Sequence, residues 1–172
     1  MQHTNNLKTD KKEYVKFAAV MLLVTGLAYL HAEWVQDYAI ATNYSLQFME
    51  SFMGVFFVVF ASFKLYRLKE FAYGLQTYET LQDKPLSWGY AYPFIQVLFG
   101  SLYLFGLGST ILDAVVFLWS AYGSYIVLLT LRKKGDVHCL CLGGVIKLPL
   151  STLSFIEDFG MSVMALAMIL MR

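Results

Sequence analysis

Five long apolar runs, separated by more polar segments, constrain this chain more than any other feature of its sequence. Each run is close to the roughly 20 residues that a helix needs to cross about 30 Å of hydrocarbon. Because backbone polar groups must be paired within lipid, each run is predicted to be a membrane-spanning helix. The runs cover residues 14–32, 46–63, 87–107, 109–131 and 150–171.

The composition agrees with an all-α integral membrane protein. Hydrophobic residues make up 58% of the 172 residues and charged residues only 15%, against about 25% charged in a typical soluble domain. The net charge of +1 gives no indication of a nucleic-acid partner. We find no glycine-rich phosphate loop, paired catalytic carboxylates or Ser-His-Asp arrangement, so the chemistry of soluble enzymes is not expected. Whether the chain is an enzyme stays open.

The basic residues are distributed unevenly along the chain. Twelve of the 13 lysines and arginines lie before or at the start of the first run, between the second and third runs, or between the fourth and fifth. With five spans these segments share one side, and the positive-inside rule places that side in the cytoplasm. We therefore expect a multi-pass protein in the lipid bilayer of a bacterial-type cytoplasmic (inner) membrane, with its N-terminus inside and its C-terminus outside.

Polar residues near the ends of the apolar runs lead to further predictions. Glu50 and Asp113 lie near outer ends, where we expect water to reach them. Lys64 ends the second run and is expected to extend to the cytoplasmic interface. The glycine-rich turn at residues 106–109 predicts a tight antiparallel pair of helices. The pattern at 68–81 predicts either an amphipathic helix in the membrane interface or an extension of the preceding helix packed on the bundle.

The two cysteines of the chain, Cys139 and Cys141, are separated by one residue and precede the last run. The cytosol is reducing, so a permanent structural disulfide is not expected there. A dithiol in this position can serve as a redox couple, or it can bind a soft metal ion such as Cu(I), zinc or mercury. The neighbouring His138 favours the thiolate form and is a candidate further ligand. Two inert thiols packed at a helix end remain the alternative.

A carboxylate and several methionines follow in the last run. Glu157 has capping-box spacing from Ser154, which gives it a structural alternative. Met161 and Met164 follow Glu157 at four and seven residues, on one helical face. Together with the cysteine pair and its histidine, these residues are candidate metal ligands along a path for a soft cation. Methionines at this spacing are also typical of ordinary core packing.

The stretch Cys139-Leu140-Cys141-Leu142-Gly143 resembles the Cys-x-Cys-Phe-Gly motif of the MauE family of methylamine-utilisation membrane proteins, which are DoxX-like. Residues 60–65 resemble the Lys-Leu at the end of that family's first helix. Residues 91–96 resemble the helix that usually carries a proline and an acidic residue. This chain has Leu142 where phenylalanine is usual and Gln96 where glutamate is common.

The resemblance implies a four-helix membrane domain over residues 46–172, preceded over residues 1–45 by a cytoplasmic N-terminus, an extra membrane helix and an outer loop. It implies a thiol-redox-associated protein beside a thioredoxin-like partner, since the family is associated with maturation of a disulfide-rich methylamine dehydrogenase subunit. The last run also resembles that of MauE-like proteins that accompany heavy-metal-binding domains. A metal permease or metal-delivery protein is therefore the alternative.

Overall fold

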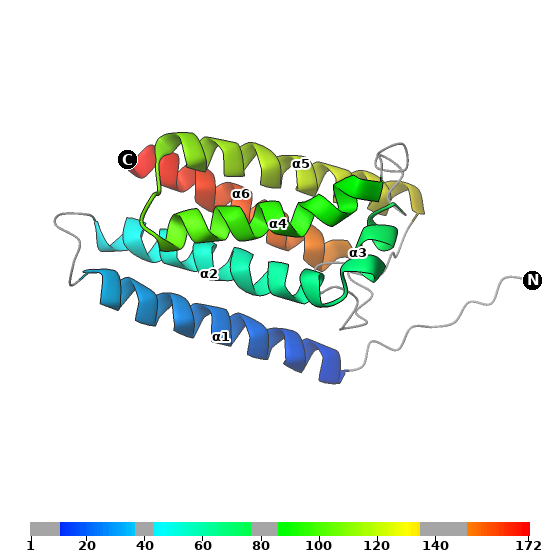
Figure 1. Cartoon of the computed structure of the whole chain (residues 1–172), viewed down its shortest axis with the longest axis horizontal. Coiled ribbons are helices and arrows are strands. Elements are labelled where there is room, and N and C mark those ends of the chain that lie inside the picture. The colour runs from blue at the N-terminus through cyan, green and yellow to red at the C-terminus, as the bar shows by residue number, and fades with distance from the viewer. Residues whose placement is uncertain (1–10, 37–42, 77–85, 135–150) are drawn as a thin grey trace, which may run out of the picture.

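The computed structural model describes residues 11–36, 43–76, 86–134 and 151–172, which form six α-helices (Figure 1). This confirms the predicted all-α class. The helices are α1 (Lys11–Gln36), α2 (Tyr44–Tyr66), α3 (Leu68–Leu75), α4 (Leu86–Leu104), α5 (Thr110–Lys134) and α6 (Ser151–Met171).

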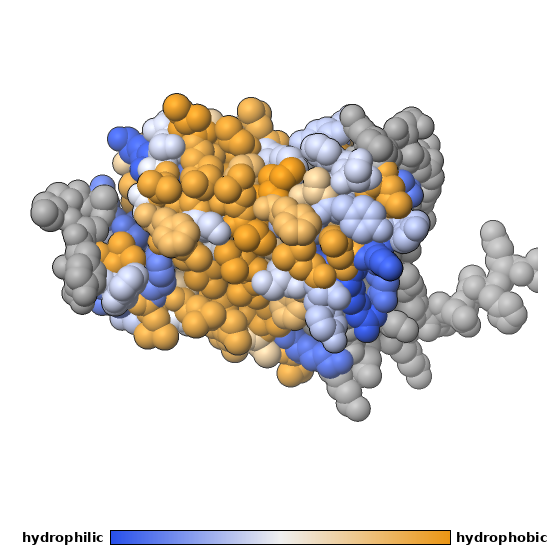
Figure 2. All heavy atoms as spheres, in the orientation of Figure 1, coloured by the Kyte–Doolittle hydropathy of each residue, from blue (hydrophilic) through white to orange (hydrophobic). Residues whose placement is uncertain are grey.

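Three of the described helices are long and apolar enough to cross a membrane. They are α1 over Val15–Val35, α2 over Tyr44–Tyr66 and α5 over Thr110–Leu129. Figure 2 shows that hydrophobic side chains cover the middle of the visible face, whereas hydrophilic side chains gather toward its two ends. An apolar belt between polar ends is the surface that lipid requires. The chain is a membrane protein with several apolar helices.

The central helix of the fold is α2, which packs against α1, α4 and α6, while α5 packs mainly against α6. The turn between α4 and α5 is as short as predicted, and Gly106 takes a φ of 69° there, a conformation that favours glycine. The tight pairing of these two helices that we predicted is nevertheless wrong. The bulky indole of Trp119 on α5 lies between them and contacts Tyr92 and Phe99 of α4, with ring centroids 5.2 and 5.8 Å away.

Glycines set the close approach of α2 to α4. A Cβ atom on Gly100 would lie 2.9 Å from the carbonyl oxygen of Gly54, and one on Gly54 would lie 3.1 Å from the carbonyl oxygen of Gly100. Small residues allow membrane helices to bring their backbones together in this way. The α2–α4 contact is therefore specified by backbone fit as well as by the burial of apolar side chains.

The short helix α3 is separated from α2 by Arg67, which leaves the helical conformation with φ −123° and ψ 48°. Its buried residues are Phe71 and Ala72, and a Cβ on Gly89 of α4 would lie 2.9 Å from the Cα of Ala72. The stretch over Leu68–Leu75 is thus packed on the bundle, as the second predicted alternative has it, but it is a separate helix and not an extension of α2. The rest of that stretch, beyond residue 76, lies outside the described residues.

Candidate functional site

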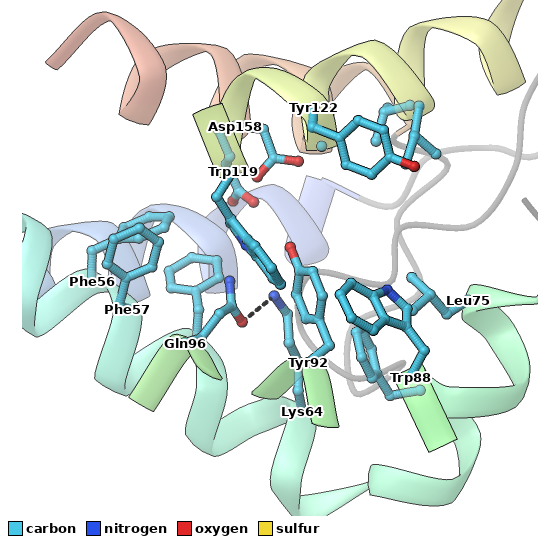
Figure 3. A pocket seen from close by; sticks show the side chains of 16 residues that line it. Phe56, Phe57, Lys64, Leu75, Trp88, Tyr92, Gln96, Trp119, Tyr122 and Asp158 are labelled. Atoms are coloured by element: carbon cyan, nitrogen blue, oxygen red, sulfur yellow. Dashed lines mark hydrogen bonds between the residues drawn. The ribbon is translucent and has the colours of Figure 1, made fainter. Parts of the chain in front are cut away.

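A pocket of about 100 Å³ lies at the end of the bundle where α5 ends and α6 begins (Figure 3). Five helices contribute to its lining, namely α2, α3, α4, α5 and α6. Phenylalanines of α2 and aromatic rings of α4 and α5 form most of its walls, and four polar side chains join them. The polar side chains are Lys64, Gln96, Glu157 and Asp158.

Lys64 is buried in this pocket, with only 6% of its surface exposed. Its Nζ donates a hydrogen bond of 2.7 Å to Gln96 Oε1, drawn as the dashed line in Figure 3. The ammonium also lies 5.0 Å from the ring centroid of Tyr92 and 5.5 Å from that of Phe71, within the range of cation–π attraction. Our expectation that Lys64 reaches the membrane interface is wrong, because α3 and α4 cover its side chain.

Trp119 forms the centre of the aromatic wall. Besides Tyr92 and Phe99, it contacts Trp88 of α4, with ring centroids 5.9 Å apart. Its Nε1 atom is buried and has no hydrogen-bond partner within the part of the chain that the structure describes. A buried N–H group without an acceptor is uncommon in native proteins and calls for an explanation.

The two carboxylates of α6 complete the pocket. Asp158 packs directly against α5 at Gly123, where a Cβ would lie 2.9 Å from Asp158 Oδ2. Its carboxylate interacts electrostatically with the ammonium of Lys64. Glu157, a candidate metal ligand in the sequence, is half-buried and lines the same pocket.

The structure describes only some of the candidate residues. Cys139, Cys141 and His138 lie outside the described residues. Met161 is buried in the hydrophobic core and Met164 packs against that core, as expected for packing residues. Within the four described segments, no group of three or more His, Cys, Asp or Glu residues could hold a metal ion.

The opposite end of the bundle contains a second polar cluster, which contradicts our expectation that Glu50 and Asp113 are solvated. Asp113 is 0% exposed and Glu50 is 7% exposed. Arg172 donates from Nε to Asp113 Oδ2 at 2.6 Å and from its NH2 group to Glu50 Oε1, while the Tyr103 hydroxyl donates to Asp113 Oδ1 at 2.9 Å. Burial lowers the pKa of Arg172, but its hydrogen bond to Asp113 and the two negative charges outweigh this and raise the pKa above its ordinary value.

Sequence reasoning missed several of these residues as a group. Lys64 and Gln96 both lie in the stretches that carry the family resemblance. That resemblance was the signal that could have indicated a common site for the two residues. The sequence contains no signal for Trp119, because an isolated tryptophan in an apolar run is typical of a lipid-facing or core position. Arg172 is the one basic residue outside the three segments that hold the other twelve, and this position alone does not indicate its partners.

Comparison with known proteins identifies the family. The family model described as methylamine utilisation protein MauE matches residues 42–171, which include α2 to α6 and the segment with the cysteine pair. No match was found among the curated proteins or among the solved structures. The resemblance inferred from the Cys-x-Cys motif is thereby confirmed, and the chain belongs to the MauE family of membrane proteins.

Proposed function

We propose that this chain is a thiol-redox protein of the cytoplasmic membrane, in which Cys139 and Cys141 form a reversible dithiol–disulfide couple. The couple exchanges with a thioredoxin-like partner. The observation that carries the proposal is the pocket around Lys64, because α5 and α6, the helices before and after the cysteine pair in the sequence, both line it. Family membership provides independent support.

The exchange follows ordinary thiol–disulfide chemistry. One cysteine thiolate attacks the disulfide of the partner, forms a mixed disulfide and releases one partner thiolate. The second cysteine then attacks the mixed disulfide, which leaves a Cys139–Cys141 disulfide and a reduced partner. Two electrons pass to the partner, and the reverse sequence returns them. A disulfide across one intervening residue closes a small, strained ring, so it is expected to be easily reduced.

We propose five membrane spans for this protein. α4 has 19 residues with no charged side chain, and α6 has 21 residues. At 1.5 Å per residue these helices are about 28 and 31 Å long, sufficient for the hydrocarbon thickness of about 30 Å. Together with the three apolar helices already described, they give a cytoplasmic N-terminus and an outer C-terminus by the positive-inside rule.

The polar groups of the fold support a membrane span between them, whichever end of α2 faces the cytoplasm. Glu50 with Arg172 and Lys64 with Gln96 lie at opposite ends of α2. The fourteen residues from Glu50 to Lys64 correspond to about 21 Å along the helix axis. The division into residues 1–45 and 46–172 also remains a proposal, supported by the start of the family match at residue 42.

The exchange reaction is tested by trapping its mixed disulfide. Cells express either Cys141→Ser or Cys139→Ser. The variant that keeps the attacking cysteine but lacks the second cysteine cannot resolve the mixed disulfide, so it is expected to accumulate a covalent adduct with a partner. The adduct is detected on a non-reducing gel, disappears with dithiothreitol and is absent from the double Cys139→Ser/Cys141→Ser variant. Absence of an adduct from both single variants, with full rescue of a deletion strain by Cys139→Ser, contradicts the proposal.

Metal delivery is the second candidate function, and the position of Glu157 favours it. Its carboxylate and that of Asp158 line one pocket, and the cysteine pair precedes both residues in the sequence. Replacing Met161 and Met164 by leucine distinguishes the two functions, because leucine keeps the packing volume but removes the sulfur. Under the redox proposal, the double leucine variant retains thiol exchange. Under the metal proposal, it loses metal movement.

A further inference from the structure

The pocket around Lys64 combines hydrogen-bond donors with flat aromatic walls. Trp119 Nε1 is a buried donor with no acceptor among the described residues. The ammonium of Lys64 carries positive charge in the same pocket, where Tyr92 and Gln96 surround it. Figure 3 shows the Tyr92 side chain beside the Lys64 amine, and the Tyr92 ring in turn contacts the Trp119 indole, with ring centroids 5.2 Å apart. A ligand with acceptor oxygens would satisfy the indole N–H and lie in the field of the ammonium.

The size and charge of the pocket narrow the class of ligand further. An engineered apolar cavity of about 150 Å³ in another protein holds one benzene ring, so a pocket of about 100 Å³ takes at most one ring, with the ring's substituents directed to the opening beside the half-exposed Tyr122. Lys64 disfavours a cationic ligand, and the two carboxylates of α6 disfavour an anion. A neutral planar ring with oxygen acceptors remains.

We propose that this pocket binds the head group of a quinone. Both redox forms of such a ring find partners there. The carbonyl oxygens of the oxidised form accept hydrogen bonds from Trp119 Nε1 and from the Lys64 ammonium. The hydroxyl groups of the reduced form donate to the carboxylates of Asp158 and Glu157.

A quinone in this pocket completes the redox chemistry of the cysteine couple. The thiols of Cys139 and Cys141 give up two electrons and two protons and join in a disulfide, and the quinone takes up both to become the hydroquinone. This step rests on the proposed function, whereas the binding site does not depend on it.

Binding is tested with tetramethyl-1,4-benzoquinone, whose ring positions are fully substituted. The purified full chain carries Cys139→Ser/Cys141→Ser, so that binding is measured without thiol chemistry. Equilibrium dialysis in detergent compares the quinone with 1,2,4,5-tetramethylbenzene, which has a similar shape but no carbonyl group. The same dialysis with protein-free micelles measures how much of each compound partitions into detergent.

We expect saturable binding of one quinone per chain, at least about tenfold tighter than binding of the hydrocarbon. Trp119→Phe keeps the aromatic wall and removes the N–H, so the affinity is expected to fall about fivefold. Lys64→Met is expected to lower it about tenfold or more. Tyr125→Phe, at an exposed position of α5, serves as the control and leaves the affinity unchanged.

The inference is overturned if the quinone only partitions into detergent, if the hydrocarbon binds equally well, or if neither Trp119→Phe nor Lys64→Met weakens binding. A separate measurement follows the absorbance of the quinone after mixing with the wild-type chain in its reduced dithiol form. Tight binding without reduction of the quinone counts against the cysteine couple and leaves the binding site supported.

Discussion

Arg172 Nε lies 2.6 Å from Asp113 Oδ2, so the residue that follows α6 is bound to the first turn of α5. The same guanidinium reaches Glu50 on α2, and the Tyr103 hydroxyl on α4 donates to Asp113. One buried cluster therefore connects the four helices α2, α4, α5 and α6. Gly108 packs against Glu50 and Arg172, where a side chain would collide with both.

Removing the guanidinium should destabilise the fold strongly. Arg172→Met leaves Asp113 and Glu50 buried without their cation, and the loss of one partner from a buried ion pair costs about 3 kcal/mol or more. The control is Arg67→Met, because Arg67 pairs with Glu70 on the exposed surface and such pairs contribute less than about 1 kcal/mol. Unfolding of both variants is followed in mixed micelles of detergent and SDS. Equal destabilisation by the two substitutions would show that the cluster does not hold the helices together.

The close contact of α2 and α4 predicts a sharp difference between glycines. Gly100→Ala places a Cβ 2.9 Å from the backbone oxygen of Gly54, and overpacking of this kind costs about 1–3 kcal/mol. At Gly26 and Gly160 an added Cβ meets nothing within 4 Å. Gly26→Ala and Gly160→Ala are therefore expected to be neutral, or to raise the stability by up to about 1 kcal/mol through helix propensity. Thermal unfolding in detergent compares the three variants.

The hydrogen bond between Lys64 and Gln96 predicts a non-additive pair of substitutions. Gln96→Leu removes the acceptor and leaves a buried ammonium, so the stability is expected to fall by about 1.5–3 kcal/mol. The double variant Lys64→Met/Gln96→Leu replaces both partners by apolar side chains and should recover most of that loss. Gln96→Glu, which introduces the family's usual residue, should be tolerated because the new carboxylate pairs with Lys64. Lys69→Met, at an exposed position of α3, is the control. A double variant as unstable as the sum of its single variants would contradict this account.

The proposed orientation predicts which positions a membrane-impermeant maleimide reaches. Single cysteines are introduced into the Cys139→Ser/Cys141→Ser chain as Tyr44→Cys, Phe105→Cys or Tyr66→Cys, at three exposed positions. In intact cells, Tyr44→Cys and Phe105→Cys should be labelled because Tyr44 begins α2 and Phe105 directly follows α4, on the proposed outer side. Tyr66→Cys, at the other end of α2, should be labelled only after permeabilisation. The reverse pattern would invert the proposed topology.

The positions of the five long helices could be predicted from the sequence because each of them follows a long apolar run. The runs 46–63 and 109–131 differ from α2 and α5 by only a few residues at each end. A run of this length must be a helix in lipid, whatever its neighbours are. The family could be predicted as well, because the Cys-x-Cys motif depends on residue spacing alone.

The pairing of helices and the burial of charges could not be predicted in this way. The short turn at residues 106–109 suggested that α4 pairs with α5, but Trp119 lies between them and the glycine contact draws α4 to α2. Glu50 and Asp113 appeared solvated because their partner, Arg172, is far from both in sequence. Such contacts depend on which faces meet in three dimensions, and the pattern of a single apolar run does not contain that information.

Thiol trapping in intact cells shows whether Cys139 and Cys141 form a reversible couple. Cells are quenched with acid and treated with a maleimide reagent that shifts gel mobility, with and without strong reductant and with and without added copper or zinc. We expect that a large fraction of the chain gains two labels only after reduction, and that added metal leaves this fraction unchanged. Two thiols that are always reduced and become protected only when metal is supplied would contradict the account and identify the pair as a metal site.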